Sequence, residues 1–247
     1  MSDVLDAPVP SSNPVAEVTV KPKRKGRIRK FVGRTLFALL IAIAIAQLAF
    51  TFSGSGKWES LGARKGVEIF VKKTPGSNIK EYKAVFKVKS TLNRFVAFST
   101  MEDTDMQIGY YDMSDVQKVS ERLIYSTWKQ KFPSPFKPRH FVVKNEFSQD
   151  PLTKVLTYHV QAANDKMPYD PCCVRVPKMN NDWHLTPLGN GELRVEWHSD
   201  LDMGGFLPYF MLNAYQPGGM RFFAHHLEQF LNAKKFDKVH YAWIQEP

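Results

Sequence analysis

An uncharged apolar run near the N-terminus constrains this 247-residue chain more than any other feature. Residues 35–52, with the sequence TLFALLIAIAIAQLAFTF, contain fifteen apolar residues in eighteen, and the next charged residue is Lys57. As an α-helix rising about 1.5 Å per residue, this run reaches roughly 27 Å, close to the hydrocarbon thickness of a bilayer. We therefore predict one transmembrane helix.

The charges before this run predict its orientation. Of the formal net charge of +10, residues 1–34 carry +5, as eight basic minus three acidic residues. Lys and Arg resist translocation, so we place the N-terminus in the cytoplasm. We expect a disordered basic cytoplasmic tail over 1–34, a signal anchor over 35–52, a linker over 53–57 and an exported domain over 58–247. In a Gram-negative bacterium this is a single-pass protein of the inner membrane with its main domain in the periplasm.

Two other interpretations of the apolar run compete with an anchor. Ala44-Ile45-Ala46 has the small-x-small pattern of a cleaved signal peptide. The region before the run is long, however, and the run continues past that pattern to Phe52, which favours an uncleaved anchor. A buried core helix would normally show a polar face, and this run has none.

Charge and cysteine usage exclude several kinds of site. The net charge left after the tail is only +5, spread along the remaining chain, so we expect no nucleic-acid partner. Cys172 and Cys173 are adjacent, and because a disulfide between neighbours is strained, we interpret them as small buried residues or free thiols. Cys and His show no metal-ligand spacing, so we predict neither a metal site nor a cofactor.

Alternating apolar and polar residues predict strands in the exported domain. Tyr82, Ala84, Phe86 and Val88 share one face of a segment whose other face is rich in Lys, a period of two. We expect further strands over 67–73, 116–128, 140–146, 155–163, 172–176 and 192–198. Strands that follow one another in this way are typical of an antiparallel meander.

Two segments have helical spacing instead. Residues 91–101 predict a short helix with Ser90 or Thr91 as its N-cap, and residues 206–235 predict a long C-terminal helix. Pro217, followed by two glycines, should kink or split the long helix. We therefore expect an α+β protein in which a curved antiparallel sheet wraps around a long C-terminal helix and leaves an internal hydrophobic cavity.

Several segments of the domain resemble the START (StAR-related lipid-transfer) family, in the same order. The strongest is residues 200–213, DLDMGGFLPYFMLN, which resembles the family's entry to its C-terminal helix. Trp58, residues 66–70 (GVEIF) and residues 80–84 (KEYKA) resemble its first strands. Residues 133–142 (PSPFKPRHFV) resemble its proline-rich turn before Arg-Asp-Phe-Val, with His140 in place of Asp. Val174-Arg175 and Trp183 resemble a later strand. The resemblance covers about residues 58–235.

This resemblance implies a helix-grip fold around a hydrophobic tunnel that binds a sterol, a phospholipid or a related lipid. We accordingly predict a protein that is not an enzyme, has no catalytic residue, and carries or presents one lipid at the membrane. Transfer across a periplasm would need a soluble acceptor protein. The predicted ligand-binding residues are Arg139, as a polar anchor for a hydroxyl or head group, and Phe86, Tyr158, Trp197, Phe206, Phe210, Met211 and Phe223.

Two alternatives remain open from sequence. An enzyme of the same fold class, a cyclase or hydrolase, would act on a hydrophobic substrate, although the histidines are scattered and no nucleophile lies in a recognisable motif. A membrane-tethered scaffold would bind a protein partner and hold no lipid. Each aromatic residue chosen here also has a simpler explanation as a part of the core.

Overall fold

A computed structural model describes residues 25–100 and 109–246 of the chain. Most of the predicted basic tail, residues 1–24, and the predicted end of the first domain helix at Met101 lie outside these residues. Two compact units are present, residues 1–47 and residues 48–247, and each is described by itself.

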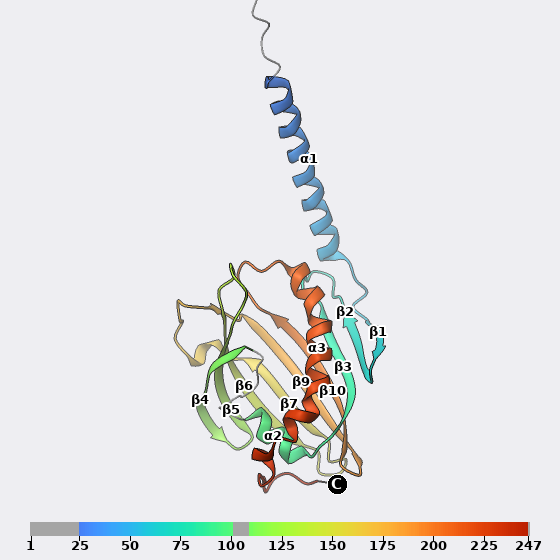
Figure 1. Cartoon of the computed structure of the whole chain (residues 1–247), viewed down its shortest axis with the longest axis vertical. Helices are drawn as coiled ribbons and strands as arrows, with labels where there is room; N and C mark the ends of the chain where they lie inside the picture. The colour runs from blue at the N-terminus through green and yellow to red at the C-terminus, as the bar shows by residue number, and fades with distance from the viewer. Residues whose placement is uncertain (1–24, 101–108, 247) are drawn as a thin grey trace, which may run out of the picture. The chain divides into compact units, whose positions relative to one another are not determined.

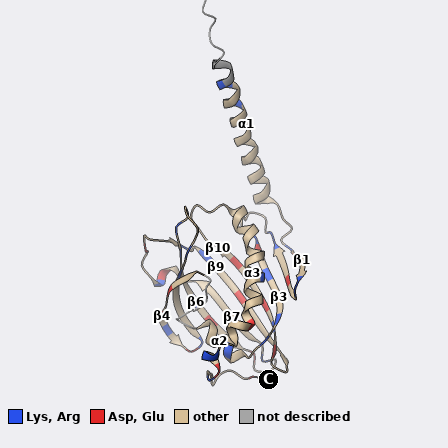
Figure 2. Cartoon of the chain, in the orientation of Figure 1, with Lys and Arg blue, Asp and Glu red and all other residues tan. Residues whose placement is uncertain are grey.

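The N-terminal helix α1 spans Lys25–Phe52, so it begins ten residues before the predicted apolar run. Its segment Arg29–Phe52 contains an 18-residue window with a mean hydropathy of 2.3 and no buried residue, and the helix is long and apolar enough to cross a membrane. Figure 2 shows that the basic residues of α1 gather near its start, while the rest of the helix carries no charge.

The domain contains one large, curved sheet, with ten strands in the described part of the chain (Figure 1). Its order is β1-β2-β3-β10-β9-β7-β6-β5-β4, all antiparallel, and the short β8 pairs in parallel with β6. The strands are β1 Trp58–Arg64, β2 Val67–Lys72, β3 Glu81–Lys89, β4 Tyr110–Ser120, β5 Leu123–Gln130, β6 Arg139–Gln149, β7 Leu156–Ala162, β8 Val174–Arg175, β9 Lys178–Gly189 and β10 Glu192–Asp202.

The pairing of β3 with β10 joins the first strands of the domain to the last. Eight residue pairs connect them, from Glu192 opposite Lys89 to Ser199 opposite Tyr82. The helix α3, Tyr209–Leu231, follows β10 and lies across the inner face of the sheet (Figure 1). The shorter α2, Leu92–Ser99, begins at the N-cap Thr91, whose hydroxyl accepts a hydrogen bond from the Arg94 amide at 3.3 Å.

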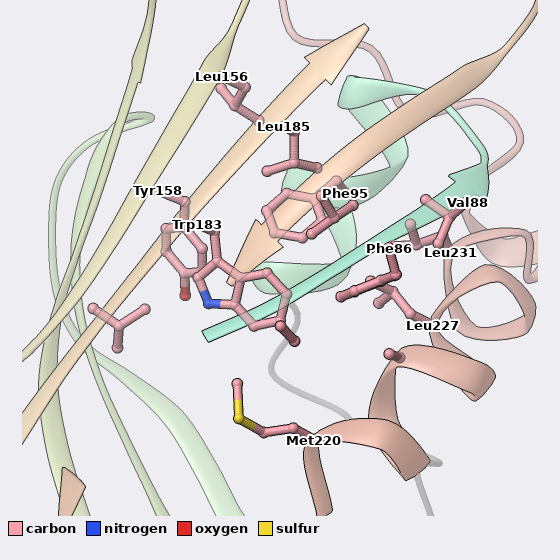
Figure 3. Packing of buried hydrophobic residues seen from close by; sticks show 14 of the residues in the cluster. Phe86, Val88, Phe95, Leu156, Tyr158, Trp183, Leu185, Met220, Leu227 and Leu231 are labelled. Carbon is pink, nitrogen blue, oxygen red and sulfur yellow. The ribbon is translucent and has the colours of Figure 1, made fainter. Parts of the chain in front are cut away.

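The core forms between the inner face of the sheet and these two helices. Along β10, Leu193 and Val195 are buried while Glu192 and Arg194 are half-buried on the other face, as period-two alternation requires. Figure 3 shows Phe86 and Val88 of β3 close to Leu227 and Leu231 of α3. The predicted fold class, an α+β helix-grip architecture with a long C-terminal helix, is confirmed.

Several local predictions need correction. The long helix is not split, because α3 runs without interruption through Pro217. The segment predicted as one strand over 116–128 is a hairpin, in which β4 ends at Ser120 and β5 begins at Leu123. The sequence interpretation missed β1 and the central strand β9. In β9, the Asn-Asn-Asp run and Pro187 are typical of turns, but pairing with strands on both sides overrides this local preference.

The two cysteines were interpreted as small buried residues or free thiols, and the structure shows that they are not free. Cys172 and Cys173 form a disulfide with an S–S distance of 2.07 Å. Cys173 is buried, whereas Cys172 is exposed. The pair lies just before β8, which pairs with the start of β6, where His140 and Val142 are buried.

Candidate functional site

A cavity of about 190 Å³ lies between the inner face of the sheet and the helices α2 and α3. Seven strands and helices besides α3 supply its wall, which is mostly apolar and aromatic. Its described lining residues are Phe95, Phe98, Ser99, Thr100, Tyr110, Met113, Ser114, Asp115, Ile124, Ser126, Thr127, Trp128, Asn145, Tyr158, Val160, Met179, Asn181, Trp183, Trp197 and Phe223.

Strand register builds the aromatic part of this wall. Trp183 of β9 lies opposite Tyr158 of β7 on one side and Trp197 of β10 on the other. Residues opposite each other in adjacent strands point to the same face, so the three rings form a row. The rings of Trp183 and Trp197 stack with centroids 4.4 Å apart, and the ring of Phe223 in α3 makes a T-shaped contact with each of them. In Figure 3, Trp183 lies between Tyr158 and Phe95.

A chain of polar side chains crosses the wall beside these rings. The Tyr158 hydroxyl donates to Asn145 Oδ1 at 2.7 Å, and Asn145 Nδ2 donates to Ser126 Oγ at 2.6 Å. Burial raises the pKa of Tyr158 above its usual value and raises the pKa of Tyr110 to about 12, with Tyr215 adding to the latter. Both phenols are therefore neutral hydrogen-bonding groups at physiological pH.

Several solved structures with this arrangement of sheet and helix are named as StAR-related lipid transfer proteins. A crystallised fragment of a STAR-related lipid transfer protein from Xanthomonas axonopodis superposes with a TM-score of 0.62, covering 71% of this chain and all of the fragment at 20% identity. Human StAR-related lipid transfer protein 5 superposes with a TM-score of 0.61, covering 83% of this chain and all of the human chain at 18% identity. The domain has the START helix-grip fold.

Sequence comparisons add one distant relative. An uncharacterised protein of Pseudomonas aeruginosa is 22% identical over 183 residues, which cover 72% of this chain and 89% of that protein. No family model matches the sequence. The START fold is therefore shown by structural similarity, and the ligand must be argued from the cavity of this chain.

Three of the eight predicted ligand-binding residues line the cavity of this START fold, namely Tyr158, Trp197 and Phe223. Phe86 is buried elsewhere in the core and borders a separate groove between β3 and α3, together with the polar side chains of Glu228 and Asn232. The structure thus brings together the inward residues of β7, β10 and α3, but leaves Phe86 of β3 beneath a different part of the helix.

Arg139 lies outside the described lining of the cavity. Its side chain is 1% exposed, and its guanidinium donates to the carbonyl oxygens of Met203 at 3.1 Å, Lys137 at 2.5 Å and Gly204 at 3.0 Å. It also lies over the ring of Phe132, with Cζ 4.5 Å from the centroid. These contacts fasten the turn between β10 and α3 to the start of β6.

The turn that Arg139 holds has little space for other residues. Gly204 and Gly205 both have positive φ, near +64° and +66°, which favours glycine. A Cβ at Gly204 would lie 2.7 Å from Pro177 Cδ, and one at Gly205 would lie 3.1 Å from Val174 Cγ2. The glycine pair therefore permits both the backbone conformation and the close approach to β8.

The other three predicted residues lie on the surface at the start of α3. Phe206 is 95% exposed, Phe210 74% and Met211 43%. Tyr215, one helical turn further, is 70% exposed. Four large apolar or aromatic side chains at one end of a domain form a surface that water solvates poorly, so this end of α3 is a candidate contact surface.

The sequence interpretation also missed residues that the cavity contains. Trp128 of β5, Asn181 of β9 and Phe95 of α2 line the wall but were not selected. Trp183 was noted only for its resemblance to the family. The available signal was the alternation in β9 of the inward residues Met179, Asn181, Trp183 and Leu185. The polar residues around Asn181, however, make this segment resemble a loop.

The position where the family has Asp holds a buried histidine. His140 Nε2 lies 2.8 Å from Thr127 Oγ1, and the Thr127 hydroxyl donates to the Phe141 carbonyl at 2.9 Å. The hydroxyl therefore accepts from Nε2–H, which leaves Nδ1 without a proton. Burial lowers the pKa of His140, and the charges of Arg175 and Lys129 lower it further. His140 is thus a neutral structural group on the outer side of β6.

Groups that resemble catalytic or metal-binding sets lie away from the cavity. His159 Nδ1 is 2.5 Å from Asp182 Oδ1, and His198 Nε2 is 3.0 Å from Glu81 Oε2, all on the outer face of the sheet. Among the described residues, one cluster of possible metal ligands is found, Asp170 with Cys172 and Cys173. Its two sulfurs are joined to each other, so neither can act as a thiolate ligand.

Proposed function

We propose that the START-fold domain binds one hydrophobic lipid in the cavity beneath α3 and carries or presents it at a membrane. The observation that carries this proposal is the cavity wall, in which stacked aromatic rings from β9, β10 and α3 surround space that side chains leave empty. The proteins that share this fold are named for StAR-related lipid transfer, which supports the same function.

The cavity volume bears on how much of a lipid fits. Drug-sized ligands occupy pockets of roughly 300–1,000 Å³, and this cavity measures about 190 Å³. A whole lipid therefore requires a wider cavity than this one, whereas a short chain or one end of a lipid fits in the present volume. Each Å² of apolar ligand surface removed from water contributes on the order of 25 cal/mol, so affinity needs no catalytic group.

Two features support a location at a membrane. The helix Arg29–Phe52 is suited to span a bilayer as an anchor, with its basic side in the cytoplasm and the domain on the periplasmic side of an inner membrane. The exposed Phe206, Phe210 and Tyr215 suit contact with lipid chains at the start of α3. The five-residue linker spans at most about 17 Å, so delivery across a periplasm needs a soluble acceptor protein.

The test uses the full chain, reconstituted in nanodiscs of deuterated phospholipid. Lipid extracted from this sample and analysed by mass spectrometry separates the deuterated host lipid from any guest retained during purification. Val160 lines the cavity and is 4% exposed. We therefore expect Val160→Trp to fill the space and to lose the guest, while the unsubstituted protein retains about one per chain.

The outcomes separate this function from its alternatives. Retention of one unaltered lipid that disappears in the folded Val160→Trp variant supports a carrier. A guest that is chemically converted during incubation indicates an enzyme of the same fold class. Absence of any guest, or equal amounts in both proteins, refutes lipid binding in this cavity and leaves a scaffold for a protein partner.

A further inference from the structure

We propose that the cavity selects an uncharged lipid that carries oxygen, with a hydroxyl group bound between Trp197 and Asn181 and a second oxygen at Trp128. This inference rests on the proposed lipid-binding function and specifies the chemical class of the ligand. The proposal excludes lipids whose anionic head group would have to enter the cavity, and hydrocarbons without oxygen should bind more weakly than lipids that carry a hydroxyl group.

Three polar atoms in the cavity wall need a partner. Trp128 Nε1, Trp197 Nε1 and Asn181 Oδ1 are buried, and each has no hydrogen-bond partner among residues 25–100 and 109–246. All three residues line the same cavity, and Asn181 is 7% exposed. Buried polar atoms in folded proteins nearly always have a partner, so three unpaired atoms around one cavity indicate that a ligand supplies it.

Strand register makes two of these residues neighbours on the same face of the sheet. Asn181 of β9 lies opposite Ser199 of β10, and Trp183 lies opposite Trp197. Trp197 and Asn181 are therefore diagonal neighbours on the inner face, at a backbone separation of roughly 7–8 Å. A hydroxyl between them can accept from the indole N–H and donate to the amide oxygen at the same time.

Trp128 marks a second point on the opposite side of the cavity. Its strand, β5, is separated from β9 by β6 and β7. Its ring stacks on Phe141 with centroids 4.8 Å apart, which fixes the plane of the indole. Because the indole N–H can only donate, the matching ligand group there is an acceptor such as a carbonyl, ester or ether oxygen.

Charges in the wall argue against an anionic guest. Among the described lining residues, Asp115 is the only Asp, Glu, Lys, Arg or His. Residues 101–108, which are adjacent in sequence to Thr100 and lie outside the described structure, include no Lys or Arg. Arg139 uses its guanidinium on three backbone carbonyls elsewhere. A phosphate or carboxylate inside the cavity would thus lose its hydration without gaining a counter-charge.

Three short probes with the same chain length test this selection in the full chain. These are 1-octanol, n-octane and octanoate, the last ionised at about pH 8. Binding to nanodiscs that contain the protein is measured by gas chromatography, relative to nanodiscs with the Val160→Trp variant, which corrects for partition into the bilayer. We expect octanoate to bind at least about ten times more weakly than 1-octanol, as an unpaired buried charge requires.

Substitutions then identify the groups that recognise the hydroxyl. Trp197→Phe and Asn181→Leu should each weaken 1-octanol binding about 3- to 10-fold, the value of one neutral hydrogen bond, while changing n-octane binding less than about twofold. Trp243 Nε1 is also buried and unpaired among the described residues, but Trp243 lies outside the described lining. Trp243→Phe is therefore the matched control, and it should alter neither probe.

Each outcome has a distinct meaning. If none of the probes binds more to the unsubstituted protein than to Val160→Trp, the proposed lipid-binding function itself fails. If n-octane and 1-octanol lose affinity equally in the variants, or octanoate binds best, the function stands and the selection proposed here is wrong. Should Asn181→Leu not fold, as judged by its thermal transition, Trp197→Phe alone decides the result. An ordered water that no probe displaces would also overturn the proposal.

Discussion

Replacing Arg139 with Met separates a structural role of this residue from the role of ligand anchor that the sequence suggests. The substitution keeps an unbranched side chain but removes the donors to the carbonyls of Lys137, Met203 and Gly204. Hydrogen bonds to a charged group contribute about 1.5–3 kcal/mol each to stability, and their contributions are not additive. We therefore expect the free energy of unfolding to decrease by about 3–6 kcal/mol. A domain of this size loses about 2–4 °C per kcal/mol, which gives a decrease in melting temperature of about 6–24 °C.

The assay is thermal unfolding of the full chain in detergent, followed by intrinsic fluorescence, together with the lipid content of the folded protein. Arg139→Lys is the matched control, since an ammonium group keeps the charge but cannot reach three carbonyls in the same geometry. Its melting temperature should lie between those of the unsubstituted protein and Arg139→Met. Lipid content per folded molecule should not change. A variant that keeps its melting temperature and loses its lipid would refute the structural role and restore Arg139 as a ligand anchor.

Two further predictions concern His140 and the start of α3. Burial lowers the pKa of His140 below 6.5, so as the pH falls the unfolded chain binds a proton at this residue before the folded protein does. The contribution of His140 to stability is therefore complete above about pH 6.5 and decreases as the pH falls below it. Melting temperatures between about pH 8 and pH 5.5 should therefore depend less on pH in His140→Gln than in the exposed control His225→Gln, and equal slopes would count against this. At the surface, the double substitution Phe206→Ser and Phe210→Ser should reduce the rate of lipid exchange with added liposomes at least about tenfold. It should change the melting temperature by less than about 2 °C, because both rings are exposed. An unchanged exchange rate would argue against membrane contact at the start of α3.

Much of the fold follows from local patterns in the sequence. The apolar run that ends at Phe52 has no polar face and predicts a spanning helix, and the alternation from Tyr82 to Val88 predicts a strand with one buried face. The segment 200–213 predicts the turn and helix that follow β10. The first two inferences need only the period of the chain, whereas the third comes from the resemblance of this segment to the START family.

The candidate site could be predicted only in part. Tyr158, Trp197 and Phe223 were selected because they point inward, and they do line the cavity. Phe210 also belongs to an apolar helix, but its ring lies on the exposed side. Periodicity identifies a face of a strand or helix, whereas the element that covers this face depends on contacts between residues distant in sequence.

The sequence by itself therefore determined a helix long and apolar enough to cross a membrane and the face that each regular strand buries, because these depend on interactions within a few residues. The class of the fold followed from the order of these elements and from the resemblance to the START family. The tertiary structure decided where side chains pack against the inner face of the sheet and where a cavity remains. The pairing of β3 with β10 closes the sheet, β9 forms against its neighbours despite a polar sequence, and together they place Trp197, Asn181 and Trp128 around one cavity. Such pairing is non-local, so no window of the sequence contains it.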